Sequence, residues 1–591
     1  MIERIGLRFL LMLAAGSAGL TTVSTAAWGQ QNLELHKYAQ EYWDARMEHF
    51  PLEATALGDH RFNDKLQDVS DMGRSGWRGR LGGLLLNVRA IDAAGLSSDD
   101  RLTRELLIRE LEREQSALDC HLHLLVLNPL DGPQVELPLI LVSQPFRNAA
   151  DYADCARRLG AFRTQVGDHI RNVHMAMSRG WVAPRAVVDL AASQMRALNV
   201  RRPEDSPFYE PLRDLEHLTP EDRPEVIKRV TDAIRESVLP AYDQLSSYVD
   251  NQYLPRCVKT EGVGSWSDGD KAYARMIRLH TTTDMSADEV HRLGLSEVAR
   301  IRGEMEKVKK EMAFAGSLDE FIRHMRKSEE QRFKSAAELY QAAERILDRA
   351  KPKMRKLFVR VPRADCVMKE IEALRAAAAP SGYYNPPPED GSRPAYYYIN
   401  TYAPTERPRF TLEALTYHEA VPGHHLQIAL HQESEDLPMF RRHAKFTAFV
   451  EGWALYAEKL GYEIGGYDDA ASRYGQLTFE MWRACRLVVD TGIHAQGWSR
   501  EKATEYMKQN TSLAEHDIEA EVDRYFAWPG QALAYKIGEL KIVALRKEAE
   551  AKLADRFDLR AFHDAVLSAG PMPLDLLEER VRGWIAAEAK E

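Results

Sequence analysis

A mainly α-helical fold with one small β element is the fold class that the sequence predicts, and three observations lead to it. Over most of the chain, apolar residues recur at three- and four-residue intervals with charged residues between them, which is the pattern of amphipathic helices. A single proline-rich break is followed by one aromatic, β-branched segment that suits a strand. The 591 residues, 45% hydrophobic and 28% charged, suffice for a large buried core in a globular protein.

The first residues are arranged like a secretory signal peptide. Arg4 and Arg8 precede the apolar run FLLMLAAGSAGL (9–20), and the small residues of STAAWGQQ (24–31) follow it. We expect cleavage after Ala27 or Gly29, which makes residues 1–29 the signal peptide. An uncleaved anchor is the alternative, but the apolar run is shorter than the roughly 20 residues that cross a bilayer.

Composition narrows the location and the partners. The first cysteine is Cys120, so no lipid-anchor cysteine lies near the cut, and no later stretch is long and apolar enough to span a membrane. We therefore expect a periplasmic or secreted protein with no stable membrane insertion after signal cleavage. The net charge of −10 offers no basic excess for phosphates, which argues against a nucleic-acid partner. The sequence does not indicate an oligomeric state.

The cysteines do not form a recognisable framework. Their number is odd, so at least one is unpaired within the chain, and none belongs to a CxxC metal motif. One disulfide remains an option in an oxidising compartment. The five residues are Cys120, Cys155, Cys257, Cys366 and Cys485.

Long helices and one strand are expected along the chain. Helical periodicity covers 100–125, 287–312, 335–358, 436–461, 471–494 and 531–555. The loop SGYYNPPPEDGSRP (381–394) cannot be helical at its prolines, and AYYYINTY (395–402) directly after it is the best strand candidate. Such a strand can hold an extended substrate through its backbone, which makes Tyr397, Tyr398 and Asn400 predicted substrate-binding residues. The alternative is a small structural hairpin packed on a helix.

The segment TYHEAVPGHHLQ (416–427) begins like the zinc-hydrolase signature HExxH but carries Pro422 where the second histidine belongs. In a straight helix, His424 lies on the wrong face from His418, and His425 lies about 10 Å further along the axis. Pro422 removes a helical amide, and Gly423 permits backbone angles closed to other residues. A proline–glycine bulge can therefore absorb two extra residues and return a histidine to the metal.

His418 and His424 are the predicted metal ligands, and Glu419 is the predicted base. His424 is preferred over His425 because it follows a glycine, as the second histidine does in many zinc motifs that end in Gly-His. His425 is then expected to support the ligands or to face the substrate.

A third ligand is predicted in KFTAFVEGWALYAEKL (445–460). Glu451 stands between Phe449 and Trp453, where an unpaired buried carboxylate is costly. Zn²⁺ would satisfy it and complete the His₂Glu set of catalytic zinc sites, which leaves one position for water. Glu458, two turns later, is expected to orient a ligand histidine. The alternative for Glu458 is a surface position beside Lys459.

HEAVPGHHLQ (418–427) followed by FVEGWALYAEKL (449–460) resembles the bacterial family known as domain of unknown function 885. The resemblance extends to 483–503, 524–546 and 557–581, whereas upstream it is limited to a helical pattern. That family in turn resembles the zinc peptidases of the thimet oligopeptidase, angiotensin-converting enzyme and Taq carboxypeptidase group, from which the interrupted HExxH departs. The resemblance implies one helical catalytic domain over 30–591, with lobes at about 30–280 and 281–591 and an internal channel.

The segment CRLVVDTGIHAQGW (485–498) offers two interpretations. Arg486, Asp490 and His494 lie at i, i+4 and i+8 of an otherwise apolar helix. They form a structural salt-bridge ladder, or His494 faces the channel, is held by Asp490, and bonds the substrate or the oxyanion.

The segment RYFAWPGQALAYKIG (524–538) contains a second proline–glycine break. Pro529 suits a helix start, so Gln531 and Tyr535 share a face at i and i+4. The resemblance to the peptidases implies a late tyrosine that donates to the oxyanion, and Tyr535 is preferred for this role over a core position. Gln531 and Lys536 are predicted to bind substrate, and either Arg524 or Lys536 is a candidate partner for a substrate carboxylate.

Together these residues predict a zinc-dependent peptidase acting on a peptide or a small amide. His418, His424 and Glu451 would hold Zn²⁺, and Glu419 would take the proton of the attacking water and pass it to the leaving amine. A narrow channel would favour short peptides, as in a carboxypeptidase or dipeptidase. The alternatives are a zinc hydrolase of a non-peptide amide or ester, a non-catalytic peptide-binding protein on the same fold, and a helical scaffold without metal. Glu419 weighs against a purely structural metal site, which needs no base.

Overall fold

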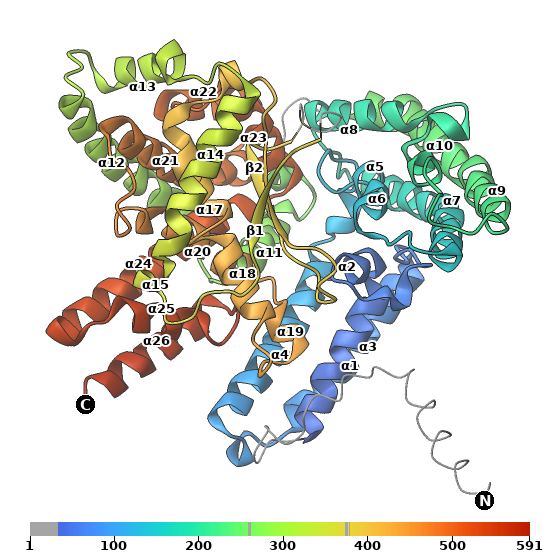
Figure 1. Ribbon diagram of the computed structural model, residues 1–591, viewed down its shortest axis with the longest axis horizontal. Helices are drawn as coiled ribbons and strands as arrows, with labels where there is room; N and C mark the ends of the chain where they lie inside the picture. Colours follow the sequence, from blue (N-terminus) through green and yellow to red (C-terminus); the bar gives the residue numbers. More distant parts are fainter. Residues whose placement is uncertain (1–32, 258–261, 373–375, 377–378, 591) are drawn as a thin grey trace, which may run out of the picture.

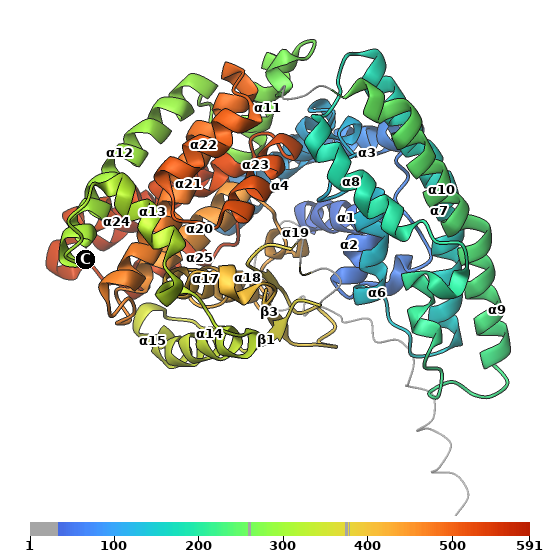
Figure 2. The same ribbon diagram turned by 90° about the horizontal axis from the view of Figure 1, so that it is seen from above.

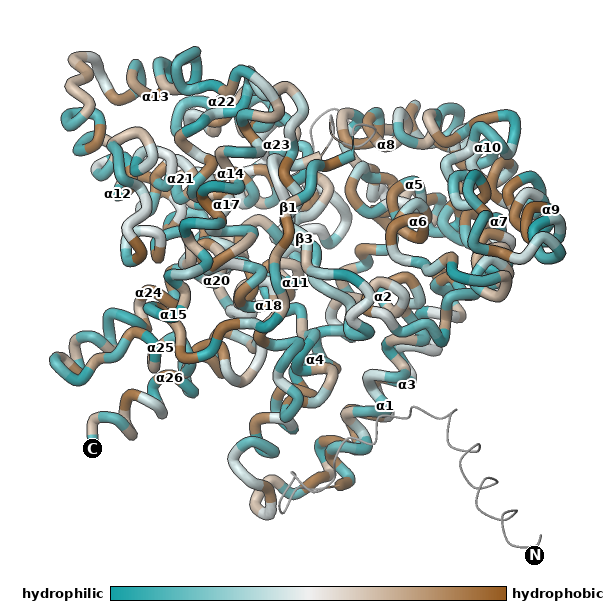
Figure 3. The backbone as a smooth tube through the Cα atoms, viewed as in Figure 1, coloured by the Kyte–Doolittle hydropathy of each residue, from teal (hydrophilic) through white to brown (hydrophobic). Residues whose placement is uncertain are grey.

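Helices form nearly all of the regular structure, as the periodicity predicts. The structure is a computed structural model that describes residues 33–257, 262–372, 376 and 379–590. The predicted signal peptide at 1–29 lies outside these residues. The mainly α fold class is confirmed, and the described residues contain a single three-stranded sheet (Figure 1). Along the helices, hydrophobic and hydrophilic residues alternate (Figure 3).

The N-terminal part of the chain forms two groups of helices. α1, α3 and α4 pack against one another, and α7 to α10 form an arm on the side of the molecule opposite the C-terminal helices (Figures 1 and 2). The helices of this part are α1 (Leu33–His49), α2 (Pro51–Ala56), α3 (Asp71–Ala90), α4 (Ser98–Asp119), α5 (Pro133–Glu136), α6 (Ile140–Ser143), α7 (Ala149–Ser178), α8 (Arg185–Leu198), α9 (Arg223–Ala233) and α10 (Leu239–Tyr248).

The two largest hydrophobic cores of the described residues meet at a different place from the predicted lobe boundary near residue 280. The arm has its own core, made of residues between Leu127 and Leu254. Side chains of α1, α3 and α4, such as Leu35 and Leu81, belong instead to the large core of the C-terminal half. The first helices therefore support the C-terminal half and do not form one lobe with the arm.

The C-terminal half contains the sequence segments proposed to form the metal site, and its long helices pack in pairs. α12 packs along α21, and α20 packs along α24. The helices of this half are α11 (Gly269–Thr281), α12 (Ala287–Glu311), α13 (Leu318–Lys327), α14 (Ala336–Ala350), α15 (Met354–Leu357), α17 (Leu412–Glu419), α18 (His424–Gln432), α19 (Met439–Arg442), α20 (Thr447–Leu460), α21 (Ala470–Gln496), α22 (Arg500–Asn510), α23 (Glu515–Ala527), α24 (Ala534–Leu553), α25 (Leu559–Leu567) and α26 (Leu574–Glu588).

Glycines bring α20 and α24 unusually close together. A Cβ at Gly538 would lie 1.8 Å from the carbonyl oxygen of Ala448, and a Cβ at Gly452 would lie 2.5 Å from the backbone of Gly538. Only hydrogen fits at such a crossing. The close approach sets Glu451 of α20 next to the first turn of α24.

The predicted strand is real, and two strands that were not predicted flank it. β3 (Ala395–Ile399) pairs in parallel with β1 (Cys366–Glu370) and antiparallel with β2 (Gly382–Asn385), in the order β1-β3-β2. β2 lies inside the segment expected to be a loop, and it ends at Asn385, where the run of prolines begins. The sheet packs on α17 through β2.

The structure also tests the cysteines and the membrane segments. All five cysteines are free thiols, so the single disulfide that their number allowed is not formed. Burial raises the pKa of the Cys120 and Cys366 thiols to about 12, which makes them unreactive. Among the helices of the described segments, none combines the length and the apolar character needed to cross a membrane.

Candidate metal centre

The interrupted motif folds as two short helices rather than as one bulged helix. α17 ends at Glu419, α18 begins at His424, and the Val421–Pro422 peptide bond between them is cis. The backbone N–H of His425 donates to the carbonyl of Ala420 at 3.1 Å. Trp453 of α20 donates from Nε1 to the carbonyl of Pro422 at 3.0 Å, which ties the break to α20. The break brings His424 back beside His418.

Gly423 is needed at this break for its backbone angles and for space. Its φ is −80° and its ψ is −129°, and this ψ falls between the main α and β regions that other residues occupy, as expected for the glycine of the break. A Cβ at Gly423 would also lie 2.0 Å from the carbonyl oxygen of His418 and 2.4 Å from that of Tyr417. The end of α17 therefore packs directly against a residue without a side chain.

We expect Gly423→Ala to lower the free energy of unfolding by about 3 kcal/mol, because the new methyl group must displace backbone atoms at the end of α17. Gly303→Ala is the matched control. It lies on an exposed face of α12 with open space around it and is expected to stabilise the protein by about 0.5–1 kcal/mol. Urea unfolding followed by circular dichroism compares the two, and equal stability of both variants would contradict the packing at Gly423.

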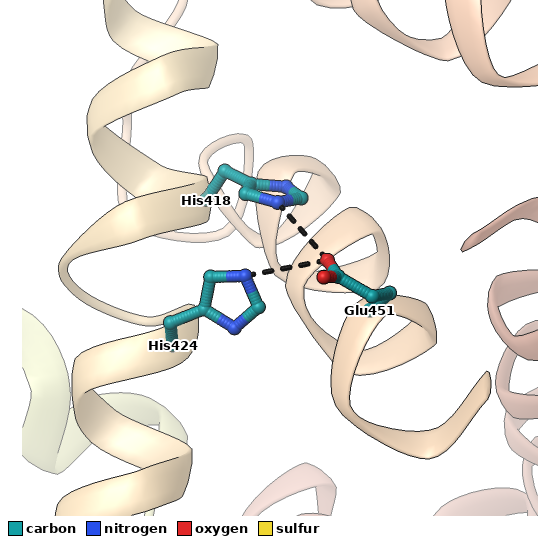
Figure 4. A group of neighbouring side chains, drawn as sticks. All are labelled: His418, His424 and Glu451. Carbon is teal, nitrogen blue, oxygen red and sulfur yellow. Dashed lines mark ion pairs between the residues drawn. The ribbon is translucent and has the colours of Figure 1, made fainter. Parts of the chain in front are cut away.

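Three side chains from α17, α18 and α20 converge on one point (Figure 4). His418, His424 and Glu451 each offer one ligand atom, and these atoms lie within 4.8 Å of one another. Glu451 Oε2 is 3.6 Å from His418 Nε2 and 3.3 Å from His424 Nε2. The two imidazole rings are almost perpendicular, at 87°.

The buried atoms of this group fit a cation. Glu451 Oε2 is buried and forms no well-aligned hydrogen bond with any described residue. Leaving such a carboxylate oxygen without a partner is costly, and a metal ion between the three ligand atoms would provide one. Two imidazoles and one carboxylate are the protein ligands of many catalytic zinc sites. The residues present therefore fit Zn²⁺.

Glu458 supports the centre from behind. Its Oε1 lies 2.9 Å from His418 Nδ1, and its side chain is completely buried. A carboxylate that accepts from the second ring nitrogen sets the tautomer of a metal-binding histidine, which leaves Nε2 free to bind. The surface position considered for Glu458 is wrong, because α20 turns this residue into the core.

We expect Glu458→Gln to weaken metal binding about 10- to 100-fold, because the ring of His418 loses its charged partner. Competition with a chromogenic chelator measures the affinity. Glu463→Gln is the control, since Glu463 lies just beyond the same helix, is exposed, and pairs with Arg546 at 2.6 Å. Equal metal affinity of the two variants would rule out a supporting role for Glu458.

Electrostatics give the centre an affinity for positive charge. Burial opposes protonation of His418, but the carboxylates of Glu451 and Glu458 outweigh it and raise the pKa of His418 to about 9. Burial likewise opposes ionisation of Glu451, but the two histidines hold the pKa of its carboxyl well below the usual range. A histidine must be neutral to bind a metal, so metal binding here would displace a proton from His418.

Glu419 and Tyr535 lie beside the ligand group. Glu419 is the half-buried last residue of α17, and burial raises the pKa of its carboxyl although the two histidines lower it. The ring of Tyr535 stacks on that of His418 at 6.4 Å and 13°. Burial, together with Glu451, raises the pKa of Tyr535, so its hydroxyl stays protonated as a donor. Gln531 Nε2 lies 3.5 Å from that hydroxyl.

His494 does not face this centre, and the predicted contact with substrate or oxyanion is corrected. Its Nδ1 accepts from the backbone N–H of Val263 at 3.1 Å, and its Nε2 donates to the carbonyl of Tyr525 at 2.9 Å. Both ring nitrogens of this buried side chain are therefore used to join separate segments. Asp490, which was expected to hold His494, makes other contacts.

Asp490 joins α21 to neighbouring segments. It accepts from the hydroxyl of Tyr273 and from the backbone N–H of Gly530 at 3.1 Å. Arg486, one turn earlier, pairs with Glu521 at 2.8 Å, so the salt-bridge ladder that was the alternative is not formed either. The partners of these side chains lie on other elements, and the spacing of residues along α21 does not identify such partners.

The substrate-binding role predicted for Lys536 is also corrected. The side chain is completely buried and pairs with Glu480 and Glu539, each at 2.9 Å, and with Glu297 at 3.1 Å. It cannot reach a substrate carboxylate from this cluster. Its neighbour Tyr535 faces the metal ligands, because successive residues of a helix point in different directions.

The β3 strand does not offer its backbone to a peptide. β1 occupies one edge of β3 and β2 the other, so its hydrogen-bonding groups are already paired. Asn400 is fully buried and donates to the carbonyls of Ala376 at 2.8 Å and Ala379 at 3.0 Å, two residues that precede β2. The predicted substrate-binding role of Asn400 is therefore corrected.

The two tyrosines of β3 are also structural. Tyr397 is fully buried, with its hydroxyl 3.4 Å from Thr416 Oγ1 of α17. Tyr398 stacks on Tyr383 of β2 at 4.8 Å and 15°. Both rings are used for packing the sheet, and the substrate contacts predicted for them are corrected.

His425 points away from the ligand group. Its Nε2 donates to the carbonyl of Ala364 at 3.1 Å, and its Nδ1 accepts from the hydroxyl of Tyr384 at 3.1 Å. It therefore joins α18 to β2 and to the segment before β1. The expectation that it supports the metal ligands or faces the substrate is corrected.

Arg483 is a site residue that the sequence patterns did not indicate. Its Nη2 lies 3.5 Å from Glu458 Oε1, so it stands directly behind the carboxylate that contacts His418. Arg483 and Arg486 lie three residues apart on a helix that is buried almost throughout. Two arginines on one face of such a helix are a signal that could have found it, because a buried guanidinium needs anionic partners.

The fold and the site define a mainly helical protein with a buried His-His-Glu centre that fits a divalent metal. The chain belongs to the family described as "Bacterial protein of unknown function (DUF885)", which matches it over residues 51–581. No curated protein matches it.

Two solved structures are similar to the chain over nearly their whole length. One is a crystal structure from Colwellia psychrerythraea described as a "putative lipoprotein", with a TM-score of 0.86 and 29% identity over 94% of this chain and 99% of that one. The other, from Shewanella oneidensis, is described as a "putative lipoprotein of unknown function", with a TM-score of 0.69 and 17% identity over 93% of this chain and 99% of that one. The second likeness concerns the fold alone.

Proposed function

We propose that this protein is a zinc-dependent peptidase that acts on short peptides outside the cytoplasm. The observation that carries the proposal is the convergence of His418, His424 and Glu451 across an interrupted motif, with Glu419 next to it. A structural site needs only ligands. A glutamate with a raised pKa beside the ligands is the arrangement that a hydrolase needs.

The chain's own residues supply the parts of a hydrolytic reaction. When bound, Zn²⁺ would act as a Lewis acid and lower the pKa of a water molecule at the centre. Glu419 accepts a proton from the attacking water and returns it to the leaving amine. The Tyr535 hydroxyl donates a hydrogen bond to the oxyanion as it forms, and Gln531 holds the phenol in place.

Two observations support an exported location. The first is the predicted signal peptide at residues 1–29. The second is the description of the similar protein from Colwellia psychrerythraea as a "putative lipoprotein", a class of exported proteins. We therefore propose a periplasmic or secreted protein.

Metal analysis and a peptide assay together test the function. We expect protein purified after export to contain stoichiometric zinc, and to cleave members of a mixed pool of short peptides, as read by mass spectrometry. A chelator should abolish cleavage, and added Zn²⁺ should restore it. Zinc-loaded protein that leaves every peptide intact would reject the peptidase. Cleavage of amide or ester compounds in the same assay would then favour a non-peptide hydrolase.

A further inference from the structure

We infer that arginines next to the metal centre bind the free C-terminal carboxylate of a peptide, so that the protein removes one or two residues from peptide C-termini. The inference rests on the proposed peptidase function for its reaction. The anion site itself depends on a separate set of contacts, made by α21, α23 and the start of α24.

Arg486 is buried, and one of its two terminal nitrogens has no hydrogen-bond partner among the described residues. Its Nε donates to the Tyr525 hydroxyl at 3.1 Å, and its Nη2 donates to Glu521 Oε2 at 2.8 Å. Its Nη1 is buried and has no hydrogen-bond partner among the described residues. The guanidinium lies 4.4 Å from the ring centre of Trp482 and 4.3 Å from that of Tyr535. These two rings hold it in one orientation.

Arg524 repeats this arrangement on α23. Its Nε donates to Glu521 Oε2 at 3.3 Å, and its Nη1 donates to Gln531 Oε1 at 3.0 Å. Its Nη2 is buried, and no described residue accepts from it. The side chain as a whole is 14% exposed, compared with 3% for that of Arg486. Glu521 therefore holds both arginines in place and leaves each with a free terminal nitrogen.

The charges next to the metal centre favour binding of an anion. Arg483, Arg486 and Arg524 bring three guanidinium groups together, while their carboxylate partners are Glu458 and Glu521. Glu458 is shared with His418, so the arginines are not neutralised. Buried guanidinium groups are costly unless they are paired, and a carboxylate matches their terminal nitrogens. A ligand carboxylate would supply the missing partner.

The distance between the anion site and the metal ligands corresponds to one or two residues of an extended peptide. Tyr535 separates the two, since its ring is 6.4 Å from that of His418 and 4.3 Å from the Arg486 guanidinium. These contacts limit the separation to at most ~11 Å, and an extended residue spans roughly 3.3–3.6 Å. After the contact distances at each end are allowed for, one or two residues fit between a carboxylate on the arginines and a carbonyl at the centre.

Binding to the zinc-loaded Glu419→Gln protein tests the inference without turnover. The probes are acetyl-Ala-Ala-Phe, its C-terminal amide, and the amide of acetyl-Ala-Ala-Asp, which offers only a side-chain carboxylate. Calorimetry should show the free acid binding about 10- to 100-fold more tightly than either amide, which is the usual value of a hydrogen bond to a charged group. Equal binding of acid and amide, or no binding of any probe, would overturn the inference. Preferred binding of the aspartyl amide would overturn the C-terminal assignment.

Variants in the same background assign the binding to Arg524. Arg524→Gln should remove most of the preference for the free acid, and Arg524→Lys should keep part of it. Arg500→Gln is the matched control, because Arg500 pairs with Asp523 of the same α23 at 2.6 and 2.9 Å and should leave the preference unchanged. Thermal unfolding checks that each variant folds. A full preference in both Arg524 variants would overturn the assignment.

The experiment separates failure of this inference from failure of the proposed function. If the acid binds preferentially but the wild-type protein hydrolyses no peptide, the carboxylate site stands and the peptidase does not. If peptides are cleaved at interior bonds and acid and amide bind equally, the peptidase stands and the carboxylate site does not.

Discussion

Glu419→Gln is expected to lower the kcat of peptide hydrolysis by about 10²–10⁴-fold, which is the usual contribution of a general base. The amide has nearly the same shape but cannot accept a proton from water. Because Glu419 is outside the ligand group of His418, His424 and Glu451, the variant should keep its zinc. Peptide turnover and zinc content are measured on the same preparation.

The control for this change is Glu435→Gln. Glu435 follows α18 in the sequence and its side chain is 80% exposed, so the same chemical change there should leave turnover unaltered. If Glu419→Gln protein with full zinc hydrolyses peptides at the wild-type rate, Glu419 is not the base and the proposed reaction is wrong.

His424→Ala is expected to lose stoichiometric zinc, whereas His425→Ala should retain it. His424 Nε2 lies 3.3 Å from Glu451 Oε2, while both nitrogens of His425 bond Tyr384 and Ala364. Loss of a direct ligand should weaken zinc binding by more than the ~10- to 100-fold that loss of a supporting residue costs. Zinc content after dialysis against a weak chelator measures the difference.

The two variants also differ in stability, which makes them a matched pair. His425→Ala leaves buried partners unsatisfied and should lower the free energy of unfolding by about 1–3 kcal/mol in the zinc-free protein. His424→Ala should cost less there, because His424 Nδ1 has no hydrogen-bond partner among the described residues. Zinc retained by His424→Ala and lost by His425→Ala would reverse the assignment of the ligands.

Most of the helices were predictable because their signal is local. The segments 287–312 and 471–494 read as amphipathic helices and appear as α12 and α21. The strand at 395–402 was found in the same way, as β3. β1 and β2 were not, because a four- or five-residue strand beside prolines and glycines is recognisable only through its partner strand.

The site residues that could be predicted are those whose side chains are costly to bury without a partner. Glu451 and Glu458 are carboxylates in apolar helical surroundings, and such groups need a cation or a donor. The structure brings Glu451 to His418 and His424, and Glu458 to His418 and Arg483. The predicted contacts of His494 and Lys536 failed for the converse reason. These buried side chains also require polar partners, but residues of other helices and segments provide them.

The sequence alone was sufficient to predict a helical fold and an acidic chain, together with a set of histidines and glutamates suited to zinc. It could do so because periodicity, net charge and the cost of burying a carboxylate are properties of short segments or of the whole composition. The preference for His424 over His425 needed the packed structure to place His424 beside Glu451, and the positions of Arg486 and Arg524 next to the ring of Tyr535 were found only there. These positions depend on how α17, α18, α20, α21, α23 and α24 pack, and side-chain spacing within one helix does not specify its neighbours.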